Sequence, residues 1–273
     1  MEALHVPAIS IVGMSLSILL SAGAPFALFF FIRRRYGKGV LPVLLGGAAF
    51  FLFAVVLEQL LHAVVLRPGP GGRAALMERP FWYMLYGALA AGVFEETARF
   101  VSFHILKKRC GGIATALKYG VGHGGAEAIL IGAVSMISTL ALSIMAGGAL
   151  AAQLGEPVLA QARAIAQTQP ALFFVAGLER LLALGIQISL SVLVYYAVYE
   201  RRRLWLFPLA VLLHAMIDCP AVLMQAGVLK NVWLAEGVTA ACMAALAALA
   251  LALHKRLEPH EPALEPEQSQ EQE

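Results

Sequence analysis

The stretch "VFEETARFVSFH", residues 93–104, places two carboxylates and a guanidinium inside a long apolar segment that begins near Phe81. A charged side chain at membrane depth costs roughly 2.5–3.5 kcal/mol on insertion scales, so each of these charges needs a partner or a function. On a helix, Arg99 can pair with Glu96 at i,i+3 or with Glu95 at i,i+4. The two glutamates are about 100° apart around the helix axis, so they cannot share one face.

Two interpretations of this cluster follow. The first is an internal ion pair that fixes neighbouring helices together. The second is that one carboxylate pairs with Arg99 and orients a site, while the other works as a general base. The spacing leaves open which of Glu95 and Glu96 is the base.

The composition places the cluster in a membrane protein. The chain has 273 residues, of which 60% are hydrophobic and 14% are charged, whereas soluble domains are about 25% charged. Apolar runs of about 18 residues or more recur, and each is long enough to cross a bilayer. We therefore predict an all-α, polytopic fold of about seven transmembrane helices, over residues 8–32, 40–66, 81–106, 119–149, 171–199, 203–225 and 232–254.

The basic residues predict the topology rather than a nucleic-acid site. They form short clusters after the first, third, fifth and seventh spans: "RRRYGK", "KKR", "RRR" and "HKR". Cytoplasmic loops carry an excess of Lys and Arg, so we expect an integral protein of the bacterial plasma membrane with its N-terminus outside and its C-terminus in the cytoplasm. Three cysteines without paired spacing indicate neither a disulfide framework nor a thiolate metal site.

The chain is predicted to form a single transmembrane domain over residues 1–257, with a catalytic core at about 81–225. The segment 150–170 is rich in Ala and Gln and has helical propensity. Residues 258–273 are acidic and contain several prolines without an apolar period, which predicts a disordered cytoplasmic tail.

Two further spans carry polar residues of the kind found in catalytic sites. "YGVGHGGAEAIL" places His123 among glycines with Glu127 one turn later, and "LLHAMIDCP" places His214 and Asp218 at i,i+4. Each pair can be a packed hydrogen-bonded pair, and a histidine with a nearby carboxylate can also be a metal ligand with its supporting group. Glu95 and His214 lie about 11 residues from the basic ends of their spans, roughly 16 Å along a helix, so we expect them at similar depth.

This set of residues suits hydrolysis assisted by a glutamate or a metal, in which a carboxylate takes a proton from water and histidines bind zinc or stabilise an oxyanion. The HExxH motif is absent, and no GxSxG, P-loop or dinucleotide motif is present. The rival interpretation is a non-enzymatic one: a proton-coupled transporter, or a membrane sensor or immunity protein with a buried charge network.

The three motifs, "EETAR", "GHGGAE" and "HAMID", together resemble those of the YhfC family of intramembrane metalloproteases, which is related to PrsW and to the CAAX-protease/bacteriocin-processing (CPBP) superfamily. The resemblance covers residues 81–225 and implies a CPBP-like helical core. The sequence departs from the superfamily pattern EExxxR, because Arg99 follows the second glutamate after two residues instead of three.

The resemblance implies a role for each matching residue. Glu95 or Glu96 would activate water, with Arg99 holding the carboxylates in place. His123 and His214 would bind a metal or an oxyanion, and Asp218 would orient the site. The implied cofactor is a divalent metal, with zinc as the expected ion, and its candidate ligands are His123, Glu127 and His214.

The expected substrate is a membrane protein or a peptide within the lipid bilayer, hydrolysed at a peptide bond, and nucleic acid is not an expected partner. A catalytic site requires one of the glutamates, His123 and His214 to converge within a few Å. We expect the bundle of spans three to six to open to water near the cytoplasmic side.

Overall fold

The computed structural model describes residues 5–69, 74–148 and 153–257, and all regular elements in those ranges are helical. The long helices are α1 (Ala8–Tyr36), α2 (Leu41–Phe50), α4 (Pro80–Leu106), α5 (Ile113–Glu127), α6 (Val134–Gly147), α8 (Pro170–Tyr199), α9 (Leu206–Gln225) and α10 (Val232–Leu257). The shorter elements are the π-helical segments η1 (Phe51–Glu58) and η3 (Ala128–Ala133), the helices α3 (Gln59–Val65) and α7 (Glu156–Gln167), and the 3-10 turns η2 (Ala75–Glu78) and η5 (Arg201–Arg203).

Six helical segments of the described chain are long and apolar enough to cross a membrane. They are α1, the continuous segment Leu41–Val65, the continuous segment Ile113–Gly147, α8, α9 and α10. Helix α4, with 27 residues, has the length of a span but carries the charged cluster. The prediction of an all-α polytopic membrane protein is confirmed.

The fourth span begins earlier than the predicted residue 119. Helix α5 starts at Ile113, directly after Gly112, whose φ of 72° is a backbone conformation that glycine adopts readily. The glycines around His123 lie inside this helix and serve its packing. Within the described part of the predicted helical segment, α7 covers Glu156–Gln167. The predicted tail, 258–273, lies outside the described residues.

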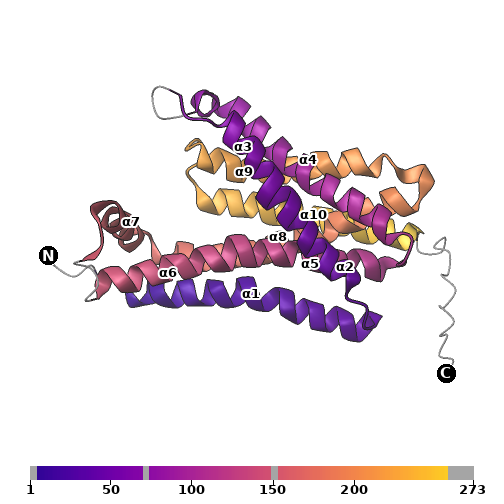
Figure 1. Ribbon diagram of the computed structural model, residues 1–273, viewed down its shortest axis with the longest axis horizontal. Coiled ribbons are helices and arrows are strands. Elements are labelled where there is room, and N and C mark those ends of the chain that lie inside the picture. Colours follow the sequence, from indigo (N-terminus) through magenta and orange to yellow (C-terminus); the bar gives the residue numbers. More distant parts are fainter. Residues whose placement is uncertain (1–4, 70–73, 149–152, 258–273) are drawn as a thin grey trace.

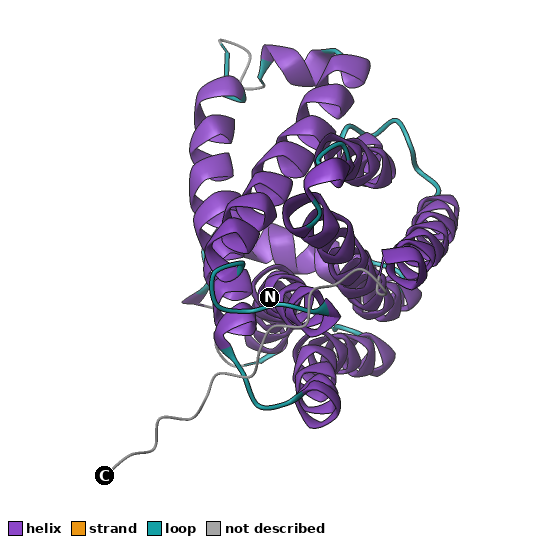
Figure 2. Cartoon of the chain, turned by 90° about the vertical axis from the view of Figure 1, so that its right-hand side faces the viewer, coloured by secondary structure: helices purple, strands orange, loops and turns teal. Residues whose placement is uncertain are grey.

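Helix α8 forms the centre of the bundle. It is the most enclosed of the candidate spans, and it packs against α1, α4, α5, α9 and α10. The long helices run side by side, with α2, α3 and α4 crossing them obliquely (Figure 1). In the view turned by 90°, most of the long helices are seen nearly along their axes (Figure 2). Side chains that α8 directs at its neighbours therefore meet inside the protein.

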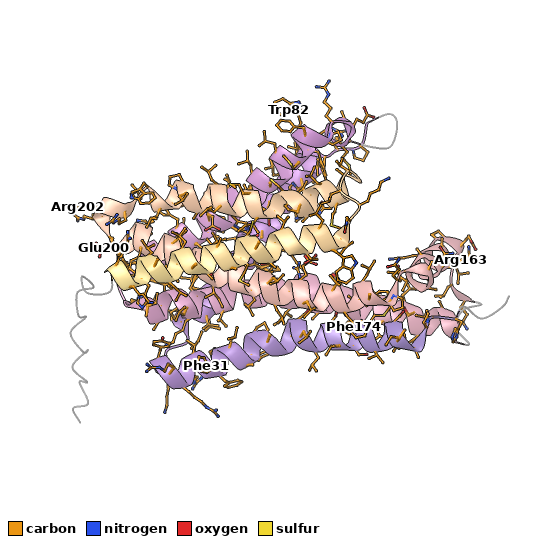
Figure 3. The ribbon with its side chains drawn as sticks, turned by 180° about the vertical axis from the view of Figure 1, so that it is seen from behind. Phe31, Trp82, Arg163, Phe174, Glu200 and Arg202 are labelled. Atoms are coloured by element: carbon orange, nitrogen blue, oxygen red, sulfur yellow. The ribbon has the colours of Figure 1, made fainter. Side chains whose placement is uncertain are left out.

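The basic clusters lie at one end of this bundle, called the basic end below. Side-chain contacts join the helix ends there: Lys118 Nζ donates to the carbonyl of Gly37 at 3.0 Å, and Lys107 Nζ donates to that of Val198 at 2.7 Å. The Tyr196 hydroxyl and His254 Nδ1 are 2.8 Å apart. Figure 3 shows Phe31, Glu200 and Arg202 at this end and Arg163 at the other. The expected orientation of the two ends in the membrane stays a prediction.

Glycines bring α5 into backbone contact with α2. A β-carbon at Gly46 would lie 2.4 Å from the carbonyl oxygen of Tyr119, and one at Gly122 would lie 2.0 Å from that of Val43. Neither position has room for a larger residue unless the helices separate. Small residues at such crossings let membrane helices pack closely. Gly122, directly before His123, and Gly46 of α2 therefore set the distance between α5 and α2.

The substitution Gly122→Ala is expected to destabilise the protein. Its methyl group would overlap the α2 backbone, and overpacking of this kind costs roughly 1–3 kcal/mol. The melting temperature in detergent should fall relative to the parent. Gly237→Ala in α10 is the matched control, because a β-carbon there meets no atom within 4 Å. Equal melting temperatures for the two variants would contradict the close approach of α2 and α5.

Candidate active site

The charged cluster of α4 forms a buried ion pair. Arg99 and Glu96 are both fully buried, at 0% exposure, and Arg99 NH1 donates to Glu96 Oε1. The Nε of Arg99 donates to the Ser191 hydroxyl of α8 at 3.2 Å. Arg99 also lies 4.0 Å from Glu95 Oε2. Of the two possible partners, Arg99 therefore neutralises Glu96.

Helix α9 adds His214 to the same carboxylate. Its Nδ1 lies 2.6 Å from Glu96 Oε1, and its Nε2 lies 3.5 Å from Asp218 Oδ2 and 4.0 Å from Glu95 Oε2. Both nitrogens face carboxylate oxygens, which only accept hydrogen bonds when ionised, so both are positioned as donors. His214 therefore connects all three carboxylates.

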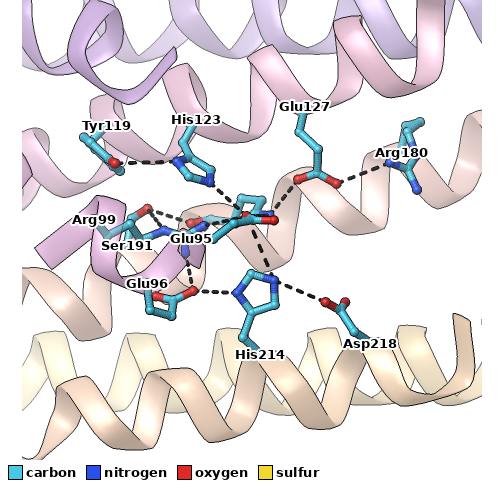
Figure 4. A network of polar contacts seen from close by, with 11 residues as sticks. Glu95, Glu96, Arg99, Tyr119, His123, Glu127, Arg180, Ser191, His214 and Asp218 are labelled. Atoms are coloured by element: carbon cyan, nitrogen blue, oxygen red, sulfur yellow. Dashed lines mark hydrogen bonds and ion pairs between the residues drawn. The ribbon is translucent and has the colours of Figure 1, made fainter. Parts of the chain in front are cut away.

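Helix α5 contributes His123 from the opposite side of Glu95. The Nε2 of His123 donates to Glu95 Oε2 at 2.9 Å, and the Tyr119 hydroxyl faces Nδ1 at 3.5 Å. His123 is fully buried. Figure 4 shows His123 and His214 on two sides of Glu95, carried by different helices. Glu95 is thus the point at which α4, α5 and α9 meet.

Gln187 of α8 completes the environment of Glu95. Its Nε2 donates to Glu95 Oε2 at 2.9 Å and to Glu127 Oε2 at 2.6 Å. Two carboxylate acceptors fix which way the amide points, because an amide oxygen there would repel them. The sequence offers little signal for this role, since a glutamine in an apolar span has no motif around it.

Glu127 belongs to a second ion pair next to the first group. Arg180 of α8 donates to Glu127 Oε1 at 3.3 Å and also to Glu179. A β-carbon at Gly132 would lie 2.8 Å from the Arg180 side chain, so this glycine makes room for the guanidinium. Glu127 is reached from Glu95 through Gln187 and does not contact His123 directly in any described interaction.

The predicted convergence is therefore present in the structure. Glu95, His123 and His214 meet within 4.0 Å of Glu95 Oε2, with Asp218 behind His214. The two glutamates differ in access: the side chain of Glu95 is 10% exposed and that of Glu96 is 0% exposed. Glu96 is enclosed by Arg99 and His214. Geometry thus distinguishes two carboxylates that the sequence left equivalent.

A smaller polar group lies on the neighbouring helices. His62 Nε2 is 3.3 Å from Glu58 Oε1, and His62 Nδ1 is 2.7 Å from the Tyr86 hydroxyl. Glu58 is the last residue of η1, and Glu127 directly precedes η3. Such π-helical turns occur frequently at functional sites, where they re-aim side chains. Both wide turns of the described chain border a carboxylate, which is buried at Glu58 and half-buried at Glu127.

The predicted metal ligands do not fit a bound divalent ion in this arrangement. Among the residues that the structure describes, no group of three or more His, Cys, Asp or Glu side chains is placed to hold a metal. The oxygens of Glu127 accept from Arg180 and Gln187, and the Gln187 amide directs N–H groups at Glu95, where a cation would be repelled. No step below passes through a metal.

A cavity of about 380 Å³ lies beside the site between α8, α9 and α10. Asp218 and Glu127 line it, so it borders the polar network directly. Its other lining residues lie between Leu172 and Ile186 on α8, between Ile217 and Met224 on α9 and between Val232 and Thr239 on α10, on the side away from the basic end. The expected opening to water near the cytoplasmic side stays a prediction, as does the orientation of the two ends in the membrane.

Comparison with known proteins identifies the family. The sequence matches the family described as YhfC intramembrane metalloprotease over residues 16–239. The chain belongs to this family. It is 34% identical over 254 residues to the "Uncharacterized membrane protein YhfC" of Bacillus subtilis (strain 168), covering 91% of this chain and 97% of the relative.

The family assignment confirms the resemblance of the three motifs to YhfC. All of the site residues described above lie inside the matched range. No solved structure matches the chain, so the relation to PrsW and the CPBP superfamily stays a prediction.

The substitution Glu96→Gln is expected to destabilise this YhfC family member more than Glu95→Gln. Removing one partner of a buried ion pair costs roughly 3–5 kcal/mol because the other charge stays buried without compensation. Arg99 would be that charge. Thermal unfolding in detergent measures the difference, with the parent as reference. A larger fall in melting temperature for Glu95→Gln than for Glu96→Gln would contradict the assignment of Glu96 as the partner of Arg99.

Proposed function

We propose that the protein is an intramembrane peptidase that uses Glu95 as its general base. The observation that carries the proposal is the meeting of His123, Gln187 and His214 at one partly accessible carboxylate, Glu95. A structural ion pair needs one cation for one carboxylate. Here Glu95 is a second carboxylate beside the Arg99–Glu96 pair, and it is surrounded by donors that orient it.

Glu95 takes a proton from a water molecule while that water attacks the carbonyl carbon of the peptide bond. His123 and Gln187 donate hydrogen bonds to Glu95 Oε2 and fix the orientation of the carboxylate. General base catalysis by a positioned side chain contributes typically 10²–10⁴-fold to the rate. The other oxygen of Glu95 is the one directed at water.

His214 acts on the oxygen side of the substrate. Its Nε2, held between Asp218 and Glu95, donates to the carbonyl oxygen as negative charge develops there. When the C–N bond breaks, Glu95 returns the proton to the leaving nitrogen. The products are a carboxylic acid and an amine, and Glu95 regains its ionised form.

Glu96 and Arg99 are positioning residues in this scheme. Glu96 accepts from Arg99 and from His214 Nδ1, which fixes the imidazole so that Nε2 faces the reaction. Arg99 balances the charge of Glu96 and, through Ser191, ties α4 to α8. The substrate is a membrane protein or peptide, and the protein acts in the bacterial plasma membrane with its basic end in the cytoplasm.

The substitution Glu95→Gln is expected to lower peptide hydrolysis by roughly 10²-fold or more, because the amide cannot accept the proton of water. The measurement is mass-spectrometric detection of cleavage products from a library of apolar peptides, with the protein in lipid nanodiscs. Glu200→Gln, at the basic end, is the matched control and should cleave like the parent. Equal cleavage by the Glu95→Gln variant would end the proposal for Glu95, and absence of cleavage by the parent would favour the transporter or sensor interpretation.

Chelation is expected to leave hydrolysis unchanged, since the described side chains form no metal-binding group. The protein is dialysed against EDTA, its metal content is measured by mass spectrometry, and the peptide assay is repeated. Activity that disappears with the metal and returns with Zn²⁺ would show that a metal-binding arrangement forms in the working enzyme, in agreement with the family's description.

A further inference from the structure

The cavity between α8, α9 and α10 is lined partly by apolar and partly by charged or polar side chains. Its apolar wall comes from all three helices, and its polar lining residues are Glu127, Glu179, Arg180, Asp218, Glu236 and Thr239. Two of these, Glu127 and Asp218, also belong to the network around Glu95 and His214. Figure 4 shows both on the same side of Glu95, with Arg180 beyond Glu127. The cavity therefore borders residues that contact the proposed reaction centre.

The charges in this cavity do not balance. Four carboxylates line it with a single guanidinium, that of Arg180. Arg180 already donates to both Glu127 and Glu179. It is packed against Gly132 on its other side, which leaves little freedom to turn toward the remaining acids. Arg180 thus donates to two of the four carboxylates, and the other two, Asp218 and Glu236, receive no hydrogen bond from it.

Asp218 and Glu236 are the two carboxylates without a basic Lys or Arg partner. The contact of Asp218 is His214 Nε2 at 3.5 Å, and its side chain is 34% exposed. Glu236, on α10, forms no hydrogen bond or ion pair with any residue that the structure describes, and it is half-buried. Carboxylates at membrane depth normally pair with a cation or line a functional path.

The cavity walls explain which cation would fit. Lys and Arg side chains lay their aliphatic stems along apolar surface and keep their charged heads in polar surroundings. The walls supplied by Val175, Ile186 and Met224 would receive such a stem, and Asp218 and Glu236 would receive the head. A bound metal ion would need a cluster of about three ligands, and the described residues form no such cluster.

We propose that this cavity binds a lysine or arginine side chain of the substrate, next to the bond that is cleaved. The proposal rests on the peptidase function and adds its substrate class: apolar peptide segments that carry one cationic residue. Because Asp218 borders both the cavity and His214, the cation would lie within a few residues of the scissile bond. The substrate would enter from the end of the bundle opposite the basic end.

The test compares two short, apolar Ala/Leu peptides, acetylated and amidated, with a fluorescent label. One carries a central lysine and the other norleucine, which keeps the stem and lacks the ammonium. Affinity for the full-length protein in lipid nanodiscs is measured by thermophoresis, and hydrolysis of the same samples is followed by mass spectrometry. Charge-assisted pairs of this kind change affinity roughly tenfold or more, so the parent should bind the lysine peptide at least about tenfold more tightly.

Variants of Glu236 decide whether the cavity provides this preference. Glu236→Gln should remove most of the lysine preference, and Glu236→Lys, which places an ammonium in the cavity beside Asp218, should abolish it. Glu200→Gln, at the basic end, should retain it. Melting temperatures of the variants confirm that each is folded.

The outcomes separate this proposal from the peptidase function. Equal affinity for the two peptides, including no binding of either, would overturn the cation site, as would a preference that survives both Glu236 variants. A preference that depends on Glu236 without hydrolysis of either peptide would support the site and contradict the peptidase function. Hydrolysis of both peptides at equal rates would support the peptidase function and contradict the cation site.

Discussion

The buried pair of Arg99 and Glu96 is the interaction on which the arrangement of the other polar residues depends. Both side chains are fully enclosed, in a span whose surroundings cannot solvate them. Arg99 has five N–H donors, and Glu96 and Ser191 accept from two of its nitrogens. Arg99 and His214 both donate to Glu96 Oε1, and Glu95 is left facing the other helices. This difference is why the proposed mechanism assigns the base to Glu95 and a positioning role to Glu96.

Helix α5 approaches its neighbours closely on two faces, which places His123 next to Glu95. On one face, Gly46 and Gly122 allow backbone contact with α2. On the other, a β-carbon at Gly120 would lie 2.6 Å from the Ile188 backbone, and one at Gly124 would lie 2.8 Å from the Gln187 side chain. His123 sits between these glycines and reaches Glu95 without a long side chain. The glycines of "GHGGAE" are therefore a packing device that places an imidazole.

Several features of the site follow from helical spacing and were predictable. The helical repeat of 3.6 residues per turn predicts the pairing of Arg99 with a glutamate and the contact of His214 with Asp218. The positions of the basic clusters predict that Glu95 and His214 lie at similar depth. Membrane helices were recognisable from apolar length. These predictions concern single helices, where periodicity decides which residues share a face.

The features that could not be predicted concern how helices are rotated and paired. The choice of Glu96 for Arg99 depends on the position of Ser191 and His214, which lie on other helices. Gln187 and the contact between Arg180 and Glu127 link α5 to α8, and nothing in either span indicates that pairing. Residues that are distant in sequence come together only when the helices pack, so their contacts cannot be assigned from the sequence of either helix.

The partners of each carboxylate distinguish those that hold the bundle together from those that face substrate. Glu96 and Glu127 each have a guanidinium and a further donor, so their charges are compensated inside the protein. Glu95 accepts from His123 and Gln187 and lies 4.0 Å from Arg99 and His214, whereas neither Asp218 nor Glu236 forms an ion pair with a Lys or Arg of the described chain. Glu96 lies fully buried between helices, whereas Glu127, Asp218 and Glu236 all border the cavity. A desolvated anion without a cation is costly, so a site of this kind is stabilised when a cationic substrate residue arrives. Under the two proposals, binding of a substrate with a cationic residue would supply the missing positive charge next to Glu95, the carboxylate that takes the proton from water.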